Sequence, residues 1–234
     1  MKPYNIFNKS INRFKLSKSD SKELWNIICP ICCNKEFLKR CDEPFYHHDT
    51  ITLGEHIIND TIVTFQLCKN KKKANIKLAC IIAMFHDLYE KPWQNARDHK
   101  KLMNKHGFVH PIEAAINAIT WYSEYFKDNK ETEIIVDGII HHMYPLPVRA
   151  MNLEIWDLNN LDKFKKLDKK YQEIISNSTK RWSIRKIGFC RSKYLEGRIV
   201  SKADKKVALS LDLKRPGAYL SLINGNNKKI VKKQ

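Results

Sequence analysis

The nine histidines of this chain all lie between residues 47 and 142, and the last 92 residues contain none. At two expected helix ends a histidine stands beside a second metal-binding side chain, because Asp87 follows His86 and His142 follows His141. Neutral imidazole offers nitrogen ligands and carboxylate offers oxygen, and one carboxylate can bridge two ions. Such a mixture is typical of sites for divalent transition metals, whereas magnesium prefers oxygen ligands alone.

His86 and Asp87 follow the longest apolar run, Leu78 to Phe85, and we take them as the candidate catalytic pair. Unsatisfied carbonyls give a helix C-terminus about half a negative charge, which favours a cation there. Asp87 is the natural bridge between two ions. For a single histidine, the alternative is an ordinary hydrogen-bonded side chain. The candidate metal ligands are His56, His86, Asp87, His110, His142 and Asp204, enough for two ions with positions left for water.

Helices are the elements expected to position these residues. Gly is scarce, at 7 of 234 residues, and long stretches lack turn signals, so the sequence predicts an all-α fold. The helix over 73–89 is apolar on nearly all sides and is expected at the centre. Pro111 suits the first position of its helix. The expected helices cover 20–40, starting at Asp20 or Ser21 and interrupted or restarted at Pro30, then 52–70, 73–89, 111–126, 131–143, 161–175 and 197–211.

The length fits one domain, with a basic lead-in over 1–19, a core over 20–212 and a basic tail over 213–234. The net charge of +18 suits a phosphate-bearing substrate or nucleic acid, although runs of solvated lysine are the alternative explanation. Trp182, among basic residues, is a nucleic-acid candidate. The aromatic residues over 121–126 are expected to pack against the helix over 73–89.

No apolar run resembles a signal peptide or approaches the ~20 residues of a membrane span, so a soluble, cytoplasmic protein without a membrane partner is expected. The seven cysteines are then not expected to form a disulfide framework. The segment CPICC over 29–33 contains a CxxC pair, but no second pair follows at the usual zinc-site spacing. Cys29, Cys32 and Cys33 are therefore expected on one buried helix face.

The order of the candidate ligands, H, HD, H, H, D, resembles that of the HD-domain metal-dependent phosphohydrolases. The sequence around these ligands is similar to that of a group of small bacterial members. The matching blocks are HHDTITLGEHI at 47–57, FHDLYEKPW at 85–93, HGFVHPIEAAINA at 106–118, IIHHMYPL at 139–146 and SKADK at 201–205. The resemblance covers roughly residues 22–212. The chain departs from the family's pattern in two places. His141 stands where the family has a basic or polar residue before its later histidine, so a switched or extra ligand is an alternative. His106 is an alternative to His110 as the ligand in its block.

The resemblance implies an HD-domain helical bundle around a central buried helix, with two divalent ions drawn from Mn, Fe, Co, Ni and Zn. His56, His86, Asp87 and Asp204 would hold one ion, and Asp87, His110 and His142 the other. It also implies hydrolysis of a phosphoester of a nucleotide or related small phosphorylated substrate by a metal-activated water. The candidate substrate-binding residues are Lys91, His141, Arg149 and Lys205.

Two other functions stay open from the sequence. The first is an HD-type phosphodiesterase or nuclease acting on cyclic nucleotides, RNA or single-stranded DNA. The second is a catalytically inactive binding module that contains metal. The oligomeric state is not indicated.

Overall fold

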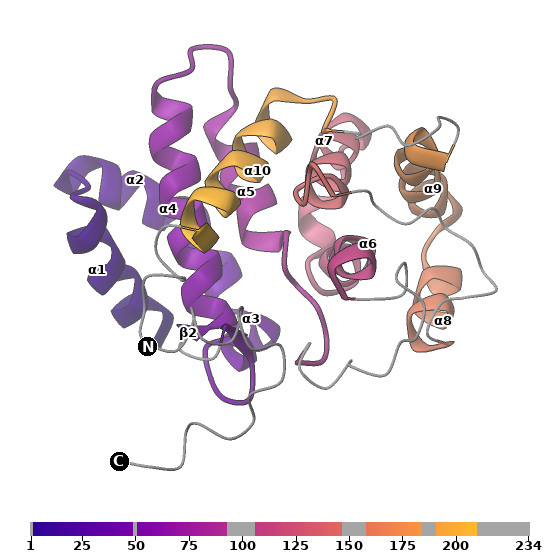
Figure 1. Cartoon of the computed structure of the whole chain (residues 1–234), viewed down its shortest axis with the longest axis horizontal. Helices are drawn as coiled ribbons and strands as arrows, with labels where there is room; N and C mark the ends of the chain where they lie inside the picture. The colour runs from indigo at the N-terminus through magenta and orange to yellow at the C-terminus, as the bar shows by residue number, and fades with distance from the viewer. Residues whose placement is uncertain (1, 49–50, 93–105, 147–157, 184–190, 210–234) are drawn as a thin grey trace.

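The computed structural model describes residues 2–48, 51–92, 106–146, 158–183 and 191–209. Within these ranges the fold is all-α apart from a short antiparallel hairpin, as the sequence predicts (Figure 1). The helices are α1 (Lys2–Phe14), α2 (Lys18–Cys32), α3 (Lys35–Arg40), α4 (Leu53–Lys69), α5 (Ile76–Phe85), α6 (His106–Trp121), the 3-10 turn η3 (Ser123–Tyr125), α7 (Asn129–Ile140), α8 (Leu158–Lys166), α9 (Lys169–Ser183) and α10 (Leu195–Val207), and the hairpin pairs β1 (Tyr46–His48) with β2 (Ile51–Thr52).

Helix α5 forms the centre of the bundle, and the prediction of a central buried helix is confirmed. Asn75 caps its N-terminus by accepting a hydrogen bond from the backbone N–H of Leu78, and every residue over 78–85 is buried. The helix packs against α2, α4, α7 and α10. An apolar surface on all sides is what such a surrounded position requires.

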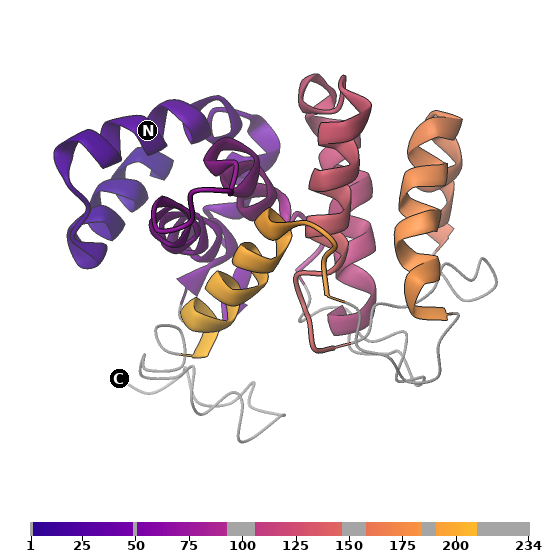
Figure 2. The ribbon, with the colours of Figure 1, turned by 90° about the horizontal axis from the view of Figure 1, so that it is seen from above.

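Helix α10 returns from the C-terminal part of the chain and lies across α4 and α5 (Figures 1 and 2). This return brings Asp204 to the N-terminal helices. The helices α8 and α9 lie at the edge of the bundle away from α1 and α2, where α8 packs on α6 and α9 packs on α7 (Figure 2). The segment expected as a lead-in forms α1, which packs on α4 and places Phe7 in the core. The division into domains stays a prediction.

The start of α4 agrees with the sequence, because Thr52 caps it through the backbone N–H of Glu55. The start predicted for α2 is wrong, since Ser17 is its cap. The interruption expected at Pro30 is also displaced. Pro30 lies inside α2, and the break comes at Asn34, whose side chain caps α3. Pro30 removes one backbone N–H from the helix, and burial of Leu24, Ile28, Ile31 and Cys32 stabilises the helix past it.

The prediction that Pro111 begins a helix is wrong, because α6 starts five residues earlier, at His106. Pro111 removes one backbone N–H from the helix, and the remaining turns are stabilised by burial of their apolar face. The consequence is that His110 is a helical residue. The predicted helix over 161–175 is two helices, α8 and α9.

The aromatic residues over 121–126 pack on α5 as expected, with the Phe85 ring centroid 4.8 Å from that of Tyr122 and 6.0 Å from that of Phe126.

The expectation that the cysteines of the CPICC segment share one buried helix face is only partly right, since Cys32 is buried but Cys33 is exposed. Because α2 ends at Cys32, Cys33 leaves the buried face.

The six cysteines in the described part of the chain are free thiols. Within the same residues, no helix combines the length and apolar character needed to cross a bilayer. The expected cytoplasmic location stays a prediction. The side chain of Trp182 and the segment 213–234 lie outside what the structure describes.

Candidate metal centre

The carboxylate of Asp87 lies at the middle of a buried cluster of imidazoles. Its Oδ1 atom is 3.1 Å from His110 Nε2 and 3.5 Å from His142 Nε2. Its Oδ2 atom is 3.6 Å from His86 Nε2 and 3.9 Å from His56 Nε2. The two oxygens therefore face two different pairs of histidines, which is the arrangement that a carboxylate bridging two ions requires.

Asp204 completes the cluster on one side. Its Oδ1 atom lies 3.4 Å from His56 Nε2 and 3.9 Å from His86 Nε2, so it joins the pair that faces Asp87 Oδ2. The six candidate ligands thus meet at one place, although they come from α4, α6, α10 and the residues directly after α5 and α7. All six are buried, with at most 8% of any of them exposed.

The protons of three imidazoles are directed away from the cluster. Nδ1 of His86 contacts the Ala83 carbonyl at 2.7 Å, and Nδ1 of His142 contacts the Ile139 carbonyl at 2.7 Å. Nδ1 of His110 contacts the His106 carbonyl at 2.8 Å. A carbonyl oxygen only accepts, so each Nδ1 carries a hydrogen, and in the neutral ring each Nε2 carries a lone pair directed at the cluster.

These inward lone pairs lack matching donors. His86 Nε2 is buried and has no hydrogen-bond partner within the described chain. The Nε2 atoms of His110 and His142 lie only 3.1 Å apart, where two lone pairs repel unless a proton or a cation lies between them. Buried polar atoms normally find partners, so a group of converging acceptors points to a positively charged occupant.

The electrostatics of the cluster agree with this reading. Burial lowers the pKa of His86 to about 4, partly offset by Asp87, so this imidazole is neutral near pH 7. Burial alone raises the pKa of Asp87, but the surrounding imidazoles outweigh it and hold that pKa well below the ordinary value. Asp204 behaves in the same way, with its pKa lowered by His56 and His86 against the effect of burial.

His110 differs from His86, because the close Asp87 carboxylate outweighs burial and raises its pKa. The Asp87 carboxylate thus favours the protonated form of His110. Metal binding displaces such protons from its ligands, which makes affinity dependent on pH.

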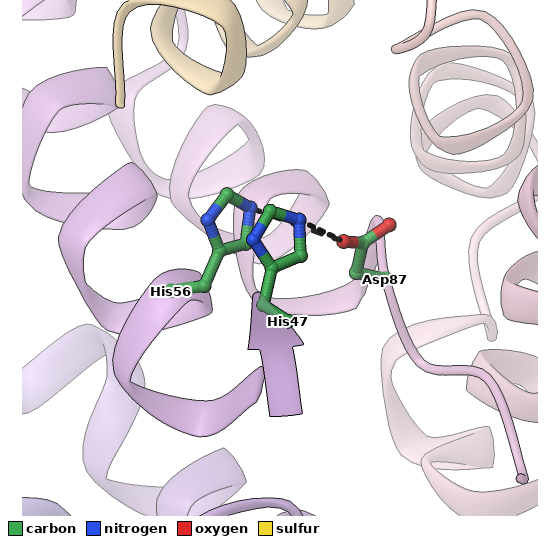
Figure 3. A group of neighbouring side chains, drawn as sticks. All are labelled: His47, His56 and Asp87. Carbon is green, nitrogen blue, oxygen red and sulfur yellow. Dashed lines mark ion pairs between the residues drawn. The ribbon is translucent and has the colours of Figure 1, made fainter. Parts of the chain in front are cut away.

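His47 also belongs to this cluster, and the sequence reasoning missed it. Figure 3 shows its imidazole, carried by β1, beside that of His56 and directed at Asp87. His47 Nε2 lies 3.7 Å from Asp87 Oδ2, and the rings of His47 and His56 stack with centroids 3.5 Å apart. The signal was the density of histidine in the block HHDTITLGEHI, from which only His56 was selected.

Asp60 is a second residue that the sequence did not reveal. It lies one turn after His56 on α4, is fully buried, and its Oδ2 atom is 3.6 Å from His86 Nδ1. Burial, together with the nearby Asp204, raises the pKa of Asp60 well above its ordinary value. Asp60 therefore lies behind His86, on the side opposite Asp87. The i, i+4 spacing from His56 was the available signal.

The loop that carries Asp87 is held by three side chains from two helices, α3 and α6. Asn117 donates a hydrogen bond of 2.7 Å to the Leu88 carbonyl, and Arg40 donates to the Tyr89 carbonyl. The Glu113 carboxylate accepts from the backbone N–H of Glu90 at 2.8 Å. These bonds fix the backbone directly after Asp87, so the direction of its carboxylate is set by α3 and α6.

The candidate substrate-binding residues are placed differently. Lys91 is exposed on the loop after Asp87, and Arg149 lies outside the described residues. Lys205 Nζ donates to Ser201 Oγ at 2.7 Å, to the Ser201 carbonyl at 2.8 Å and to the His142 carbonyl at 3.1 Å. Its three hydrogens are thus directed to protein oxygens, and its substrate role stays a prediction.

His141 contributes to a separate polar cluster around Asp137, which we call the Asp137 clamp: Asp137, His141, Ser178, Ser192 and the backbone N–H of Lys193. Asp137 Oδ2 accepts hydrogen bonds from Ser192 Oγ at 2.6 Å and from the Lys193 N–H at 2.8 Å. His141 Nε2 lies 3.4 Å from Ser178 Oγ. The clamp ties α7 to α9 and to the segment that begins α10, so these contacts suit a structural role for His141 rather than contact with substrate.

Three groups within the buried cluster could each hold an ion, since one ligand atom of every member lies within 4.8 Å of the others: His47, His56 and Asp87; His56, His86 and Asp204; His86, Asp87 and His142. Nitrogen and carboxylate ligands of this kind suit divalent transition metals. Comparison with protein-family models, with curated proteins and with solved structures finds no match to this chain.

Proposed function

We propose that this chain is a metal-dependent phosphohydrolase of the HD type, acting on a phosphoester of a nucleotide or a related small phosphorylated substrate. The observation that carries the proposal is the position of the Asp87 carboxylate, whose two oxygens face separate pairs of histidines. Together with the order of the ligands along the sequence, this supports a two-ion site. Mn, Fe, Co, Ni and Zn are the metals that suit the ligands.

Each residue has a definite task in this proposal. His56, His86 and Asp204 would hold one ion and His110 and His142 the other, with one oxygen of Asp87 available to each. When bound, such a pair of ions lowers the pKa of a water and stabilises the charge that develops on phosphoryl oxygens. The carbonyls bonded to Nδ1 keep the rings of His86, His110 and His142 oriented, and the buried setting keeps bulk water from the ligands.

The experiment is a metal and substrate screen on the purified chain. Protein loaded with Mn, Co or Fe is expected to release phosphate from a nucleotide or a generic phosphoester. Asp87→Asn, which keeps the size of the side chain, is expected to abolish this release, while Glu124→Gln at an exposed position retains it. Undiminished turnover in Asp87→Asn would exclude the proposed site.

A phosphodiesterase or nuclease is the second candidate, favoured by the net charge of +18. Binding to nucleic-acid phosphates weakens as salt rises, because counterions are no longer released favourably. A gel-shift assay with RNA and single-stranded DNA at low and high salt separates the two. Binding at low salt together with metal-dependent cleavage supports the diesterase, and no binding at low salt excludes the polymer as substrate. Filled metal sites without turnover on any phosphoester would instead indicate an inactive binding module.

A further inference from the structure

A cavity of about 300 Å³ lies between the turn that follows α7 and the outer face of α10. Most of its wall is carbon, from Tyr144, Pro145 and the aliphatic stems of long side chains. Its volume reaches the lower end of the ~300–1,000 Å³ typical of small-molecule sites. The described lining residues are Tyr144, Pro145, Arg191, Ser192, Arg198, Ser201, Lys202 and Lys205.

The charge of this cavity is of one sign. Arg198, Lys202 and Lys205 follow one another at intervals of four and three residues, so they lie on the same face of α10. Among the described residues that line the cavity, none is acidic. Like charges at this spacing destabilise a helix unless an anion lies against them.

The acidic side chains of α10 are engaged elsewhere. Glu196 accepts a hydrogen bond of 2.8 Å from the backbone N–H of Asn75, and Asp204 faces His56. Lys205 is bonded to protein oxygens, whereas Arg198 and Lys202 are exposed. These two cations can therefore turn toward a ligand in the cavity.

We propose that this cavity binds a mononucleotide. The planar base fits against Tyr144, Pro145 and the aliphatic stems, where an aromatic ring offers a stacking surface. The phosphate fits Arg198, whose guanidinium makes two parallel hydrogen bonds, and Lys202, which acts as a compact positive charge. A ligand with only one of these parts would leave either the carbon wall or the cations without a partner.

The cavity shares its backbone with the metal centre. Lys205 follows Asp204 directly and donates to the carbonyl of His142, and Tyr144 lies two residues after His142. The described lining of the cavity includes none of the six candidate metal ligands, so the bound mononucleotide would lie beside the metal centre and not on it. Nucleotide binding in the cavity therefore does not rest on the proposed function.

Binding is measured first, by titration calorimetry in metal-free Asp87→Asn, so that neither metal-bound phosphate nor turnover contributes. The probes are AMP, adenosine and inorganic phosphate. AMP is expected to bind at least about 10-fold more tightly than either fragment. Arg198→Gln and Lys202→Gln should each weaken AMP binding by about 10-fold, the loss that one charge-assisted hydrogen bond commonly brings. Lys22→Gln, an exposed lysine on α2, is the matched control and should bind as its parent does.

Unchanged AMP affinity in both cavity variants would overturn the site. Equal affinity for adenosine and AMP would overturn the role of the cations, and equal affinity for phosphate and AMP that of the carbon wall. Absence of any hydrolysis by the metal-loaded protein would refute the proposed function and leave the calorimetric result standing.

Discussion

The metal centre and the Asp137 clamp contain the same kinds of side chain but differ in where the protons point. In the clamp, Asp137 accepts hydrogen bonds from Ser192 and from a backbone N–H, so its charge is met by donors within the chain. In the metal centre, the imidazoles around Asp87 direct their Nδ1 hydrogens to carbonyls and turn lone pairs inward. The charge of Asp137 is thus met by donors within the chain, whereas the lone pairs around Asp87 could hold a cation.

This difference also shows why proximity alone is a poor guide to chemistry. Ser178, His141 and Asp137 have the residue types of a nucleophilic triad. However, Ser178 Oγ and Asp137 Oδ1 both lie near the same nitrogen of His141, Nε2, at 3.4 and 3.8 Å. A triad requires the serine and the carboxylate on opposite ring nitrogens. The clamp is therefore better described as a structural tie between helices.

The largest expected effect separates the two regions by metal affinity. Asp87→Asn should weaken metal binding by more than about 100-fold, because loss of a bridging ligand exceeds the 10–100-fold cost of losing a ligand's hydrogen-bond partner. Asp137→Asn, made in parallel, should keep metal binding near the native value. Elemental analysis after gel filtration measures both. Equal metal content in the two variants would remove the distinction between the regions.

For stability we expect the opposite ranking, with the larger effect at the Asp137 clamp. Asp137→Ala should lower the free energy of unfolding by about 2–3 kcal/mol, since two donors to a buried carboxylate lose their acceptor. Urea denaturation of the metal-free chain measures this loss. Metal binding per folded molecule should be retained, and a loss of metal greater than the loss of folded protein would show that the clamp also shapes the metal centre.

An intermediate effect is expected at the loop that carries Asp87. Asn117→Ala removes the donor to the Leu88 carbonyl and should weaken metal affinity by about 10-fold, as loss of a positioning hydrogen bond commonly does. Metal titration followed by fluorescence or calorimetry measures the change. The control is Thr120→Ala, three residues later on the same helix, which removes only a local hydrogen bond to the Ile116 carbonyl. An equal loss of metal affinity in this variant would contradict the positioning role of Asn117.

The smallest effect is expected at the weakest contact of the clamp. Ser178→Ala removes hydroxyl contacts at 3.4 Å to both Asp137 and His141. The unfolding free energy should fall by no more than about 1 kcal/mol, because long contacts of this kind lie at the weak end for hydrogen bonds. Activity should be unchanged. Loss of activity without loss of stability would instead assign the serine a chemical role.

Part of the fold was readable because helices depend on local spacing. The apolar run over 78–85 predicted the central helix, and Thr52 marked the start of α4. Other boundaries were not readable, because tertiary burial outweighed the local signal of Pro30 and Pro111. Helix α1 was missed although Phe7, Ile11 and Phe14 recur at helical spacing and lie against the core, because the basic and polar residues of 1–19 were interpreted as a lead-in.

The sequence by itself determined the residue types, which are nitrogen and carboxylate ligands of the kind that suits divalent transition metals. It also placed His86 and Asp87 at the end of the central helix. Only the tertiary structure decided that Asp204 reaches them, since α10 must cross α4 and α5 for this contact to form. Folding likewise brought in His47 and Asp60 and assigned His141 to the clamp. The physical reason is that helix formation depends on neighbours three and four residues apart, whereas a metal centre depends on which helix faces are buried together.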